Sequence, residues 1–198
     1  MKTKELSRRR FIALAAAGTG GMLFLTRCSN PQRFSLYRFF SEEEAQLVDA
    51  IVDQIIPPDE WAGGKDAGVT HFIDRQLAGV YNRFQERYTS GLNALKATCE
   101  SLYQKTFPEL DWEEQTNFLR QMDGGKLAEL RIIKNPGKPE EGYLWENGED
   151  SAFFRLLRDH AMQGFYGSPR HGGNLNYVSY KMIRLDYPLI IGQNRYKS

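Results

Sequence analysis

The stretch Gly164-Phe165-Tyr166-Gly167-Ser168-Pro169-Arg170-His171-Gly172-Gly173-Asn174 lies near the C-terminus and decides where the helical pattern before it must end. Glycine has a large backbone entropy cost in a helix, and proline has no amide hydrogen to donate. Four glycines and one proline within eleven residues therefore predict a shaped loop after a helix. A plain glycine-rich helix stop is one interpretation, and the aromatic and polar content of the stretch favours a second, a loop that makes contacts.

The loop combines residues that set its shape with residues that could contact a partner. Pro169 presets a turn, whereas the Gly172-Gly173 pair permits positive φ and a close approach of another backbone. Tyrosine is enriched at protein interfaces because its ring supplies contact area at a modest entropy cost. We therefore predict a partner-docking loop, whose residues are Tyr166, Gly167, Pro169, Arg170, His171, Gly172, Gly173 and Asn174.

An apolar helix should lead into this loop, and aromatic residues follow it. The helical spacing of Phe153, Phe154, Leu157, Ala161 and Phe165 predicts a buried stripe. Asp150 or Ser151 is the expected cap of that helix.

Tyr177, Tyr180, Ile183 and Tyr187 lie beyond the loop and predict a final aromatic helix or turn. The residues from Ile190 to Ser198 are interpreted as a tail.

The first helix of the body is marked at both ends. Ser41 and Glu44 form a capping box, and Pro57-Pro58 cannot continue a helix. Between them, apolar residues recur at helical spacing, at Val48, Ile51, Val52 and Ile55.

Further apolar periodicity predicts a second helix from Val69 to Phe84 and a third from Tyr88 to Tyr103. A fourth helix follows the cap Asp111-x-x-Glu114 and stops at Gly124-Gly125. The signals weaken over residues 126–148, where Leu127, Leu130 and Ile133 suggest a short helix within a mobile or partner-specific excursion.

These patterns predict an all-α fold, a single irregular helical bundle after an N-terminal export signal, because no alternating strand pattern or internal repeat is present. We divide the chain into a signal with a lipobox-like end (1–28), a linker (29–40), the helical domain (41–188) and a tail (189–198). The chain has 198 residues and a formal net charge of +1. A general nucleic-acid binder would carry a concentrated basic excess, so no nucleic-acid partner is expected.

The N-terminus resembles an export signal. Arg8 and Arg9 lie in the run S-R-R-R-F-I of residues 7–12, which precedes the moderately apolar residues 13–25. That run is shorter than the roughly 20 apolar residues of a membrane-spanning helix, and the pattern predicts a twin-arginine signal read by its translocase. Because this route carries folded proteins, we expect the small chain to carry the signal for a larger, cofactor-loaded partner.

Cys28 ends an imperfect lipoprotein cleavage box, L-T-R-C-S at residues 25–29, in which Arg27 replaces the usual small residue. Two interpretations stay open. Lipidation at Cys28 would anchor the protein at the periplasmic face of the membrane, and several acyl chains would be needed for stable attachment. Otherwise Cys28 is an ordinary cysteine of a differently processed signal.

Sites for intrinsic chemistry are scarce in the sequence. The glycine loop lacks the lysine and hydroxyl residue of a P-loop, and the two cysteines form no C-x-x-C pair. His71, His160 and His171 do not have metal-ligand spacing, so we expect no metal and no cofactor in this chain. Cys99 lies on an apolar stripe and is interpreted as a buried hydrophobe.

Two further candidates for chemistry lie in predicted loops. Asp59 and Glu60 are adjacent acids of a loop, which are usually solvated and only rarely take part in acid–base or calcium chemistry. His171 remains the one loop candidate for a general base, and it would need an orienting partner.

Two motifs together give the chain a resemblance to a known family. They are D-x-I-I-P-x-D at residues 53–59 and G-F-Y-x-x-P-x-x-G-G-N at residues 164–174, accompanied by the segment from Gly68 to Asp74. From about Ser41 to about Pro188 the chain resembles the gluconate 2-dehydrogenase subunit 3 family. It departs from the family pattern at Tyr180, where a tryptophan is expected, and in the insertion-like residues 124–148.

The resemblance implies an exported, non-catalytic small subunit of a sugar or alcohol dehydrogenase complex, associated with the membrane. It implies a large FAD-containing partner subunit of the glucose–methanol–choline type and, in a third subunit, haem c. The small subunit would carry the export signal and assist the maturation and stability of the flavoprotein.

Two alternatives remain. One is a stand-alone exported lipoprotein that binds a carbohydrate or acts as an enzyme through the His171 loop. The other is an envelope protein that tethers other proteins.

Overall fold

The computed structural model describes residues 36–127, 145 and 148–185, and the predictions at Arg8, Arg9, Cys28, Leu130, Ile133 and Tyr187 lie outside these ranges. Within them the protein is all-α, without strands, which confirms the predicted fold class. The α-helices are α2 (Glu42–Ile55), α3 (Val69–Leu77), α4 (Gln85–Tyr103), α5 (Trp112–Asp123), α7 (Glu149–Tyr166) and α8 (Val178–Met182). Short 3₁₀ helices are η1 (Asn82–Phe84), η2 (Phe107–Glu109), η3 (Pro169–His171) and η4 (Leu175–Tyr177).

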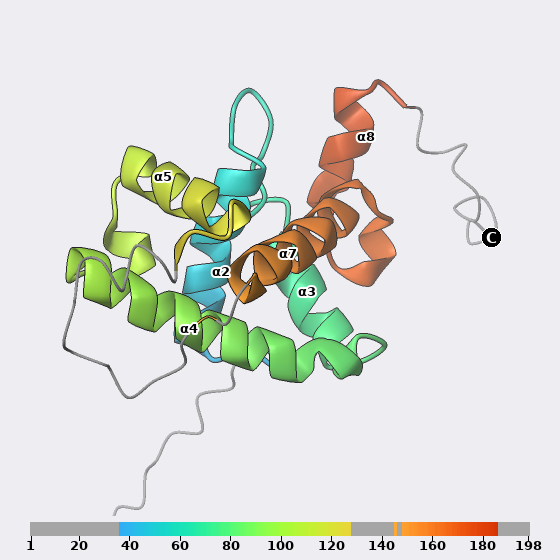
Figure 1. Ribbon diagram of the computed structural model, residues 1–198. Coiled ribbons are helices and arrows are strands. Elements are labelled where there is room, and N and C mark those ends of the chain that lie inside the picture. The colour runs from blue at the N-terminus through green and yellow to red at the C-terminus, as the bar shows by residue number, and fades with distance from the viewer. Residues whose placement is uncertain (1–35, 128–144, 146–147, 186–198) are drawn as a thin grey trace, which may run out of the picture. The chain divides into compact units, whose positions relative to one another are not determined.

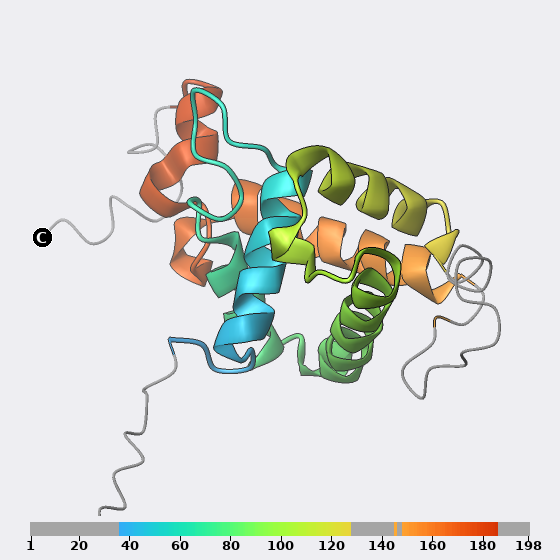
Figure 2. The same cartoon turned by 90° about the vertical axis from the view of Figure 1, so that its left-hand side faces the viewer.

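Helix α7 is the central element of the fold. It packs against each of the other five α-helices, and Figures 1 and 2 show it in orange among them. Phe153, Leu157, Ala161 and Phe165 of the predicted stripe are buried, and Phe154 is half-buried. Because α7 is held on several sides, the loop that continues from its C-terminal end starts from a fixed point.

The start of α7 differs from the prediction. Its N-cap is Gly148, at φ 79°, and neither Asp150 nor Ser151 caps the helix. Asp150 lies in the first turn, where its buried carboxylate accepts hydrogen bonds from the amides of Leu127 (3.1 Å) and Ser151 (2.8 Å). The Asp150 side chain, one of the two expected caps of α7, thus bonds instead to an amide 23 residues away in sequence.

The predicted first helix is confirmed at both ends by α2. The Ser41 hydroxyl accepts from the amide of Glu44 (3.2 Å), while the Glu44 carboxylate accepts from the amide of Ser41 (2.8 Å). The helix ends at Ile55, just before Pro57. Val48, Ile51 and Val52 of its stripe are buried.

The second helix is shorter than predicted. Helix α3 ends at Leu77, and Gly79 follows within the turn that leads to η1. Val80, which the apolar pattern placed on the helix, is 73% exposed. The apolar residues after the turn instead belong to η1 and its flank, where Tyr81 packs edge-on against Phe84.

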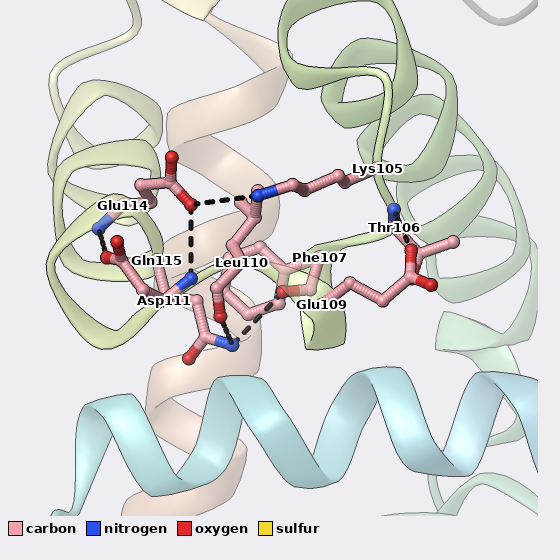
Figure 3. A network of polar contacts seen from close by, with 8 residues as sticks. All are labelled: Lys105, Thr106, Phe107, Glu109, Leu110, Asp111, Glu114 and Gln115. Atoms are coloured by element: carbon pink, nitrogen blue, oxygen red, sulfur yellow. Dashed lines mark hydrogen bonds and ion pairs between the residues drawn. The ribbon is translucent and has the colours of Figure 1, made fainter.

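Two consecutive caps organise the connection between α4 and α5 (Figure 3). The Glu109 carboxylate accepts from the amide of Thr106 and from its hydroxyl, both at 2.8 Å, and Asp111 forms the predicted capping box with Glu114. The buried side chain of Gln115 donates through its Nε2 to the carbonyl oxygens of Phe107 (3.0 Å) and Leu110 (3.2 Å).

The segment before α2 is attached to α3 by one carboxylate. Asp74 is 2% exposed and accepts hydrogen bonds from the amides of Arg38, Phe39 and Phe40 at 2.8–3.0 Å. Charge-assisted bonds of this kind are about twice as strong as neutral ones. The chain is therefore fixed at residues 38–40 before α2 begins.

None of the helices in the described part of the chain has both the length and the apolar character of a membrane span.

Candidate functional site

The predicted loop folds back onto the helix that precedes it. Gly173 is buried, and a Cβ on it would overlap the carbonyl oxygen of Gly164 and lie 2.9 Å from that residue's carbonyl carbon. A Cβ on Gly167 would likewise overlap the carbonyl oxygen of Gln163. Gly173 confirms the close backbone approach that the sequence predicted for the Gly172-Gly173 pair, and Gly167 makes a second such approach.

Asn174 fixes the loop from inside. Its side chain is fully buried; its Nδ2 donates to the carbonyl oxygen of Gly167 (2.9 Å), and its Oδ1 accepts from the amide of Ser179 (3.0 Å). The hydroxyl of Tyr180 donates to the same carbonyl oxygen of Gly167 (3.3 Å). One side chain thus joins the end of α7, the loop and the start of α8. Tyr180, the residue at which the chain departs from the family pattern, adds a further hydrogen bond.

The loop presents several of its side chains outward. Tyr166 is 50% exposed, Arg170 and His171 are exposed, and Pro169 and Gly172 are half-buried. Gly172 has φ 104°, a conformation that favours glycine, and a Cβ on it would lie 3.0 Å from the Arg75 side chain. Docking by these residues remains a prediction, and the buried Gly173 and Asn174 serve the shape of the loop and not direct contact.

The backbone after the loop is unusual. Asn174, Asn176 and Tyr177 have φ of 48°, 56° and 59°. Asparagine tolerates this left-handed region, but it is uncommon for a bulky side chain such as tyrosine. Conformations of this kind persist where surrounding contacts determine them, and the bonds of Asn174 supply such contacts here.

A groove of about 580 Å³ lies beside the loop, between α3 and α7. Its size is within the usual range of ligand and side-chain sites. It is lined by Phe72, Gln76, Tyr81, Met162, Gln163, Tyr166, Gly167 and His171. Of these, Tyr166, Gly167 and His171 were predicted from the sequence as site residues.

Sequence reasoning missed Gln76, Met162 and Gln163, and it assigned Phe72 and Tyr81 only to an apolar helical stripe. Met162 and Gln163 adjoin the predicted loop in sequence, which is the one signal that could have found them. Gln76 is brought to the groove only by the packing of α3 against α7.

The polar groups of the groove fall into two kinds. The hydroxyl of Tyr81 donates to Oε1 of Gln163 at 2.5 Å. The Gln76 amide, the Tyr166 hydroxyl and the His171 ring, in contrast, make no hydrogen bond to any described residue. The groove thus offers free donors and acceptors above an apolar floor.

The other two histidines have structural positions, as predicted. His160 is buried; its Nδ1 lies 3.0 Å from the hydroxyl of Tyr88, and its ring stacks on Tyr81 with centroids 4.7 Å apart. Burial lowers the pKa of His160, which keeps the ring neutral. His71 stacks on Tyr37, with centroids 4.8 Å apart.

Cys99 is fully buried, and burial raises the pKa of its thiol to about 12. A thiolate is the reactive form of cysteine, so this thiol is inert in the folded protein, as the apolar stripe indicated.

The acidic loop shows local bonding. Asp59 accepts from the amide of Trp61 at 2.7 Å. Over residues 36–127, 145 and 148–185, no group of three His, Cys, Asp or Glu side chains is arranged to hold a metal ion.

Comparison with known proteins gives one match. A family model described as gluconate 2-dehydrogenase subunit 3 matches residues 42–186, which is more than half of the chain and includes both the loop and the groove. No curated protein matches, and no solved structure matches.

Proposed function

The chain belongs to the gluconate 2-dehydrogenase subunit 3 family, and from this premise we propose that it is the non-catalytic small subunit of an exported, FAD-dependent sugar or alcohol dehydrogenase. Its partner is a large flavoprotein subunit of the glucose–methanol–choline type. A third subunit with haem c passes electrons onward. The FAD and the haem belong to these partners.

The loop at residues 164–174 is the observation that supports a docking role. Its shape is set from within by Gly173 against α7 and by the two hydrogen bonds of the buried Asn174. Tyr166, Arg170 and His171 are exposed on this fixed frame. Interfaces gain affinity when their contact residues are ordered before binding, because less entropy is lost on association.

The state of His171 favours docking over catalysis. A general base needs a group that orients its ring, and the His171 ring has no hydrogen-bond partner among the described residues. A histidine that contacts a partner protein does not need this orientation in the free subunit.

Binding would stabilise the flavoprotein by mass action. A subunit that binds only the folded partner stabilises it by about 2.7 kcal/mol when its free concentration is one hundred times Kd. Together with the signal at Arg8 and Arg9, this accounts for assistance to maturation and for export of the folded pair. Lipidation at Cys28 would hold the complex at the periplasmic face of the membrane.

Affinity capture tests the proposal directly. The tagged chain is captured from gently solubilised membranes of its own host, and the absorption spectrum and subunit masses of the product are recorded. We expect a large subunit with flavin absorption, and haem absorption if the third subunit is present. A colourless protein recovered alone, or one that oxidises a sugar by itself with an added acceptor, would overturn the proposal.

A double variant, Arg170→Ala with His171→Ala, tests the loop within the same assay. Both side chains are exposed, so the variant should fold as the wild type does. We expect it to recover less flavoprotein. Equal recovery would place the contact elsewhere on the subunit.

A further inference from the structure

The groove between α3 and α7 is built on a close helix contact. A Cβ on Gly164 of α7 would lie 2.8 Å from Cδ1 of Phe72 of α3, so the glycine lets the two helices approach at this point. Phe72 is 6% exposed and forms part of the groove's floor, while Met162 and Tyr166 stand at its side, 41% and 50% exposed. The surface is therefore apolar and carried on two packed helices.

The charge of the lining restricts what can occupy it. None of the lining residues is Lys, Arg, Asp or Glu. A charged side chain seated against Phe72 and Met162 would lose hydration and find no opposite charge among the lining residues, which is costly. An uncharged, apolar occupant fits the groove.

The free polar groups indicate a peptide as that occupant. A glutamine side chain offers a donor and an acceptor together, which match the carbonyl and amide of a peptide bond. Gln76 is half-buried, and neither its side-chain amide nor the Tyr166 hydroxyl or the His171 ring at the same groove bonds to a residue that the structure describes. Methionine and tyrosine are also residue types that interfaces favour, because methionine adapts its shape and tyrosine adds rigid area.

We propose that this groove receives an extended segment of the flavoprotein subunit, with an uncharged aromatic or aliphatic side chain seated against Phe72 and Met162 and its peptide groups bound by Gln76. The inference rests on the proposed function and adds the location and the chemistry of the contact. The groove is continuous with the docking loop, since Tyr166, Gly167 and His171 belong to both.

A charge placed in the groove tests the proposal. Met162→Glu puts a carboxylate at the apolar surface, and Trp112→Glu puts one at a similarly exposed apolar residue outside the groove, 52% exposed at the start of α5. We expect Met162→Glu to lower recovery of the flavoprotein at least about tenfold, the usual loss at a central contact residue, and Trp112→Glu to leave it unchanged. Thermal unfolding of the two free variants should agree with that of the wild type.

Photo-crosslinking provides a second measurement that does not depend on loss of binding. p-Benzoylphenylalanine is placed at position 162, or at position 112 as the control, in the chain expressed in its own host. Irradiation should join position 162 to a flavoprotein peptide that is apolar and uncharged at the site of attachment. A charged attachment site, or flavoprotein attached only from position 112, would overturn the proposal.

The outcomes separate this inference from the proposed function. If the wild type captures a flavoprotein and Met162→Glu captures it equally well, the groove is not the contact although the accessory role stands. If the wild type captures none, both fail. Glucose added to the isolated protein would overturn the inference if it shifted the NMR signal of the Gln76 side-chain amide, because the groove would then be a sugar site.

Discussion

The Nδ2 atom of Asn174 donates a hydrogen bond across 2.9 Å to the carbonyl oxygen of Gly167, and both groups are shielded by the loop that they close. The same side chain accepts from the Ser179 amide, so one buried residue satisfies backbone groups on two sides.

Asn174→Leu should destabilise the protein strongly. It leaves the buried Ser179 amide without its partner, and an unsatisfied buried group costs about 1–3 kcal/mol, whereas the Gly167 carbonyl keeps the bond from Tyr180. Leucine at φ 48° adds roughly 1–2 kcal/mol of backbone strain. Urea unfolding followed by circular dichroism measures the loss. Asn176→Leu is the matched variant, since Asn176 has a similar φ of 56° but an exposed side chain; a stability loss equal to that of Asn174→Leu would contradict this account.

Gly173→Ala should destabilise the protein although it adds a single methyl group. The new Cβ meets the backbone of Gly164, which cannot move aside as a side chain can, and overpacking of this kind costs about 1–3 kcal/mol. Gly124→Ala is the control because its Cβ would be 3.5 Å from the nearest atom, at φ −77°. It should be neutral or slightly stabilising. Equal effects of the two substitutions on the free energy of unfolding would refute the close-approach explanation.

Asp74→Asn should release the segment before α2. The asparagine side chain keeps one acceptor oxygen for the backbone amides of Arg38, Phe39 and Phe40, which now bond to a carboxylate. Its NH2 group also adds a donor that faces these backbone donors. Limited trypsin digestion should then cleave after Arg38 faster than in the wild type. Asp123→Asn removes only a surface ion pair with Arg158, at 4.0 Å, and should leave the cleavage rate unchanged.

His160 should make the protein less stable as the pH falls below about 6.5, the ordinary pKa of histidine in the unfolded chain. Its folded-state pKa is lowered by burial, and Arg83 acts in the same direction while Asp159 opposes it. The unfolded state therefore binds the proton more readily, and stability declines as pH falls toward the folded-state pKa, with a slope of at most about 1.4 kcal/mol per pH unit.

Urea unfolding at several pH values measures this slope. His160→Gln keeps a polar side chain near the Tyr88 hydroxyl and should remove this part of the pH dependence. A slope that persists in the variant would assign the effect to other groups.

Cys99 should not react with Ellman's reagent in the folded protein at pH 8. Its pKa of about 12 leaves roughly one thiolate in ten thousand, and the side chain is fully buried. In a Cys28→Ser variant, which leaves one cysteine, the thiol should react stoichiometrically after unfolding in guanidinium. Rapid reaction without denaturant would show that the α4 region opens readily.

The sequence predicted best those features that depend on neighbours within one helical turn. The caps at Ser41 and Asp111 were recognised because each side chain bonds to the backbone three residues away. The end of α3 was missed because Val80 and Tyr81 continue the apolar spacing, and only the turn at Gly79 separates them from the helix. Periodicity does not record such a turn when apolar residues follow it.

Features made by distant residues were harder to predict. Asp150 was assigned to a cap, but Leu127 engages its carboxylate. Asn174 was predicted among the residues of the docking loop, whereas the structure buries it and uses both ends of its amide inside. Gln76 and Gln163 line the same groove only because their two helices pack together. Neither helix carries a local sequence signal for that packing.

If Cys28 is lipidated, as we propose, the attachment of residues 38–40 to Asp74 also limits how far Arg38 can lie from the membrane. Arg38 lies ten positions after Cys28, and a fully extended chain spans at most about 3.6 Å per position, or roughly 36 Å. In a chain lipidated at Cys28, Arg38 could therefore rise no farther than this above the lipid surface. In such a chain, the hydrogen bonds of Asp74 would set the length of this tether between the bilayer and the helical domain.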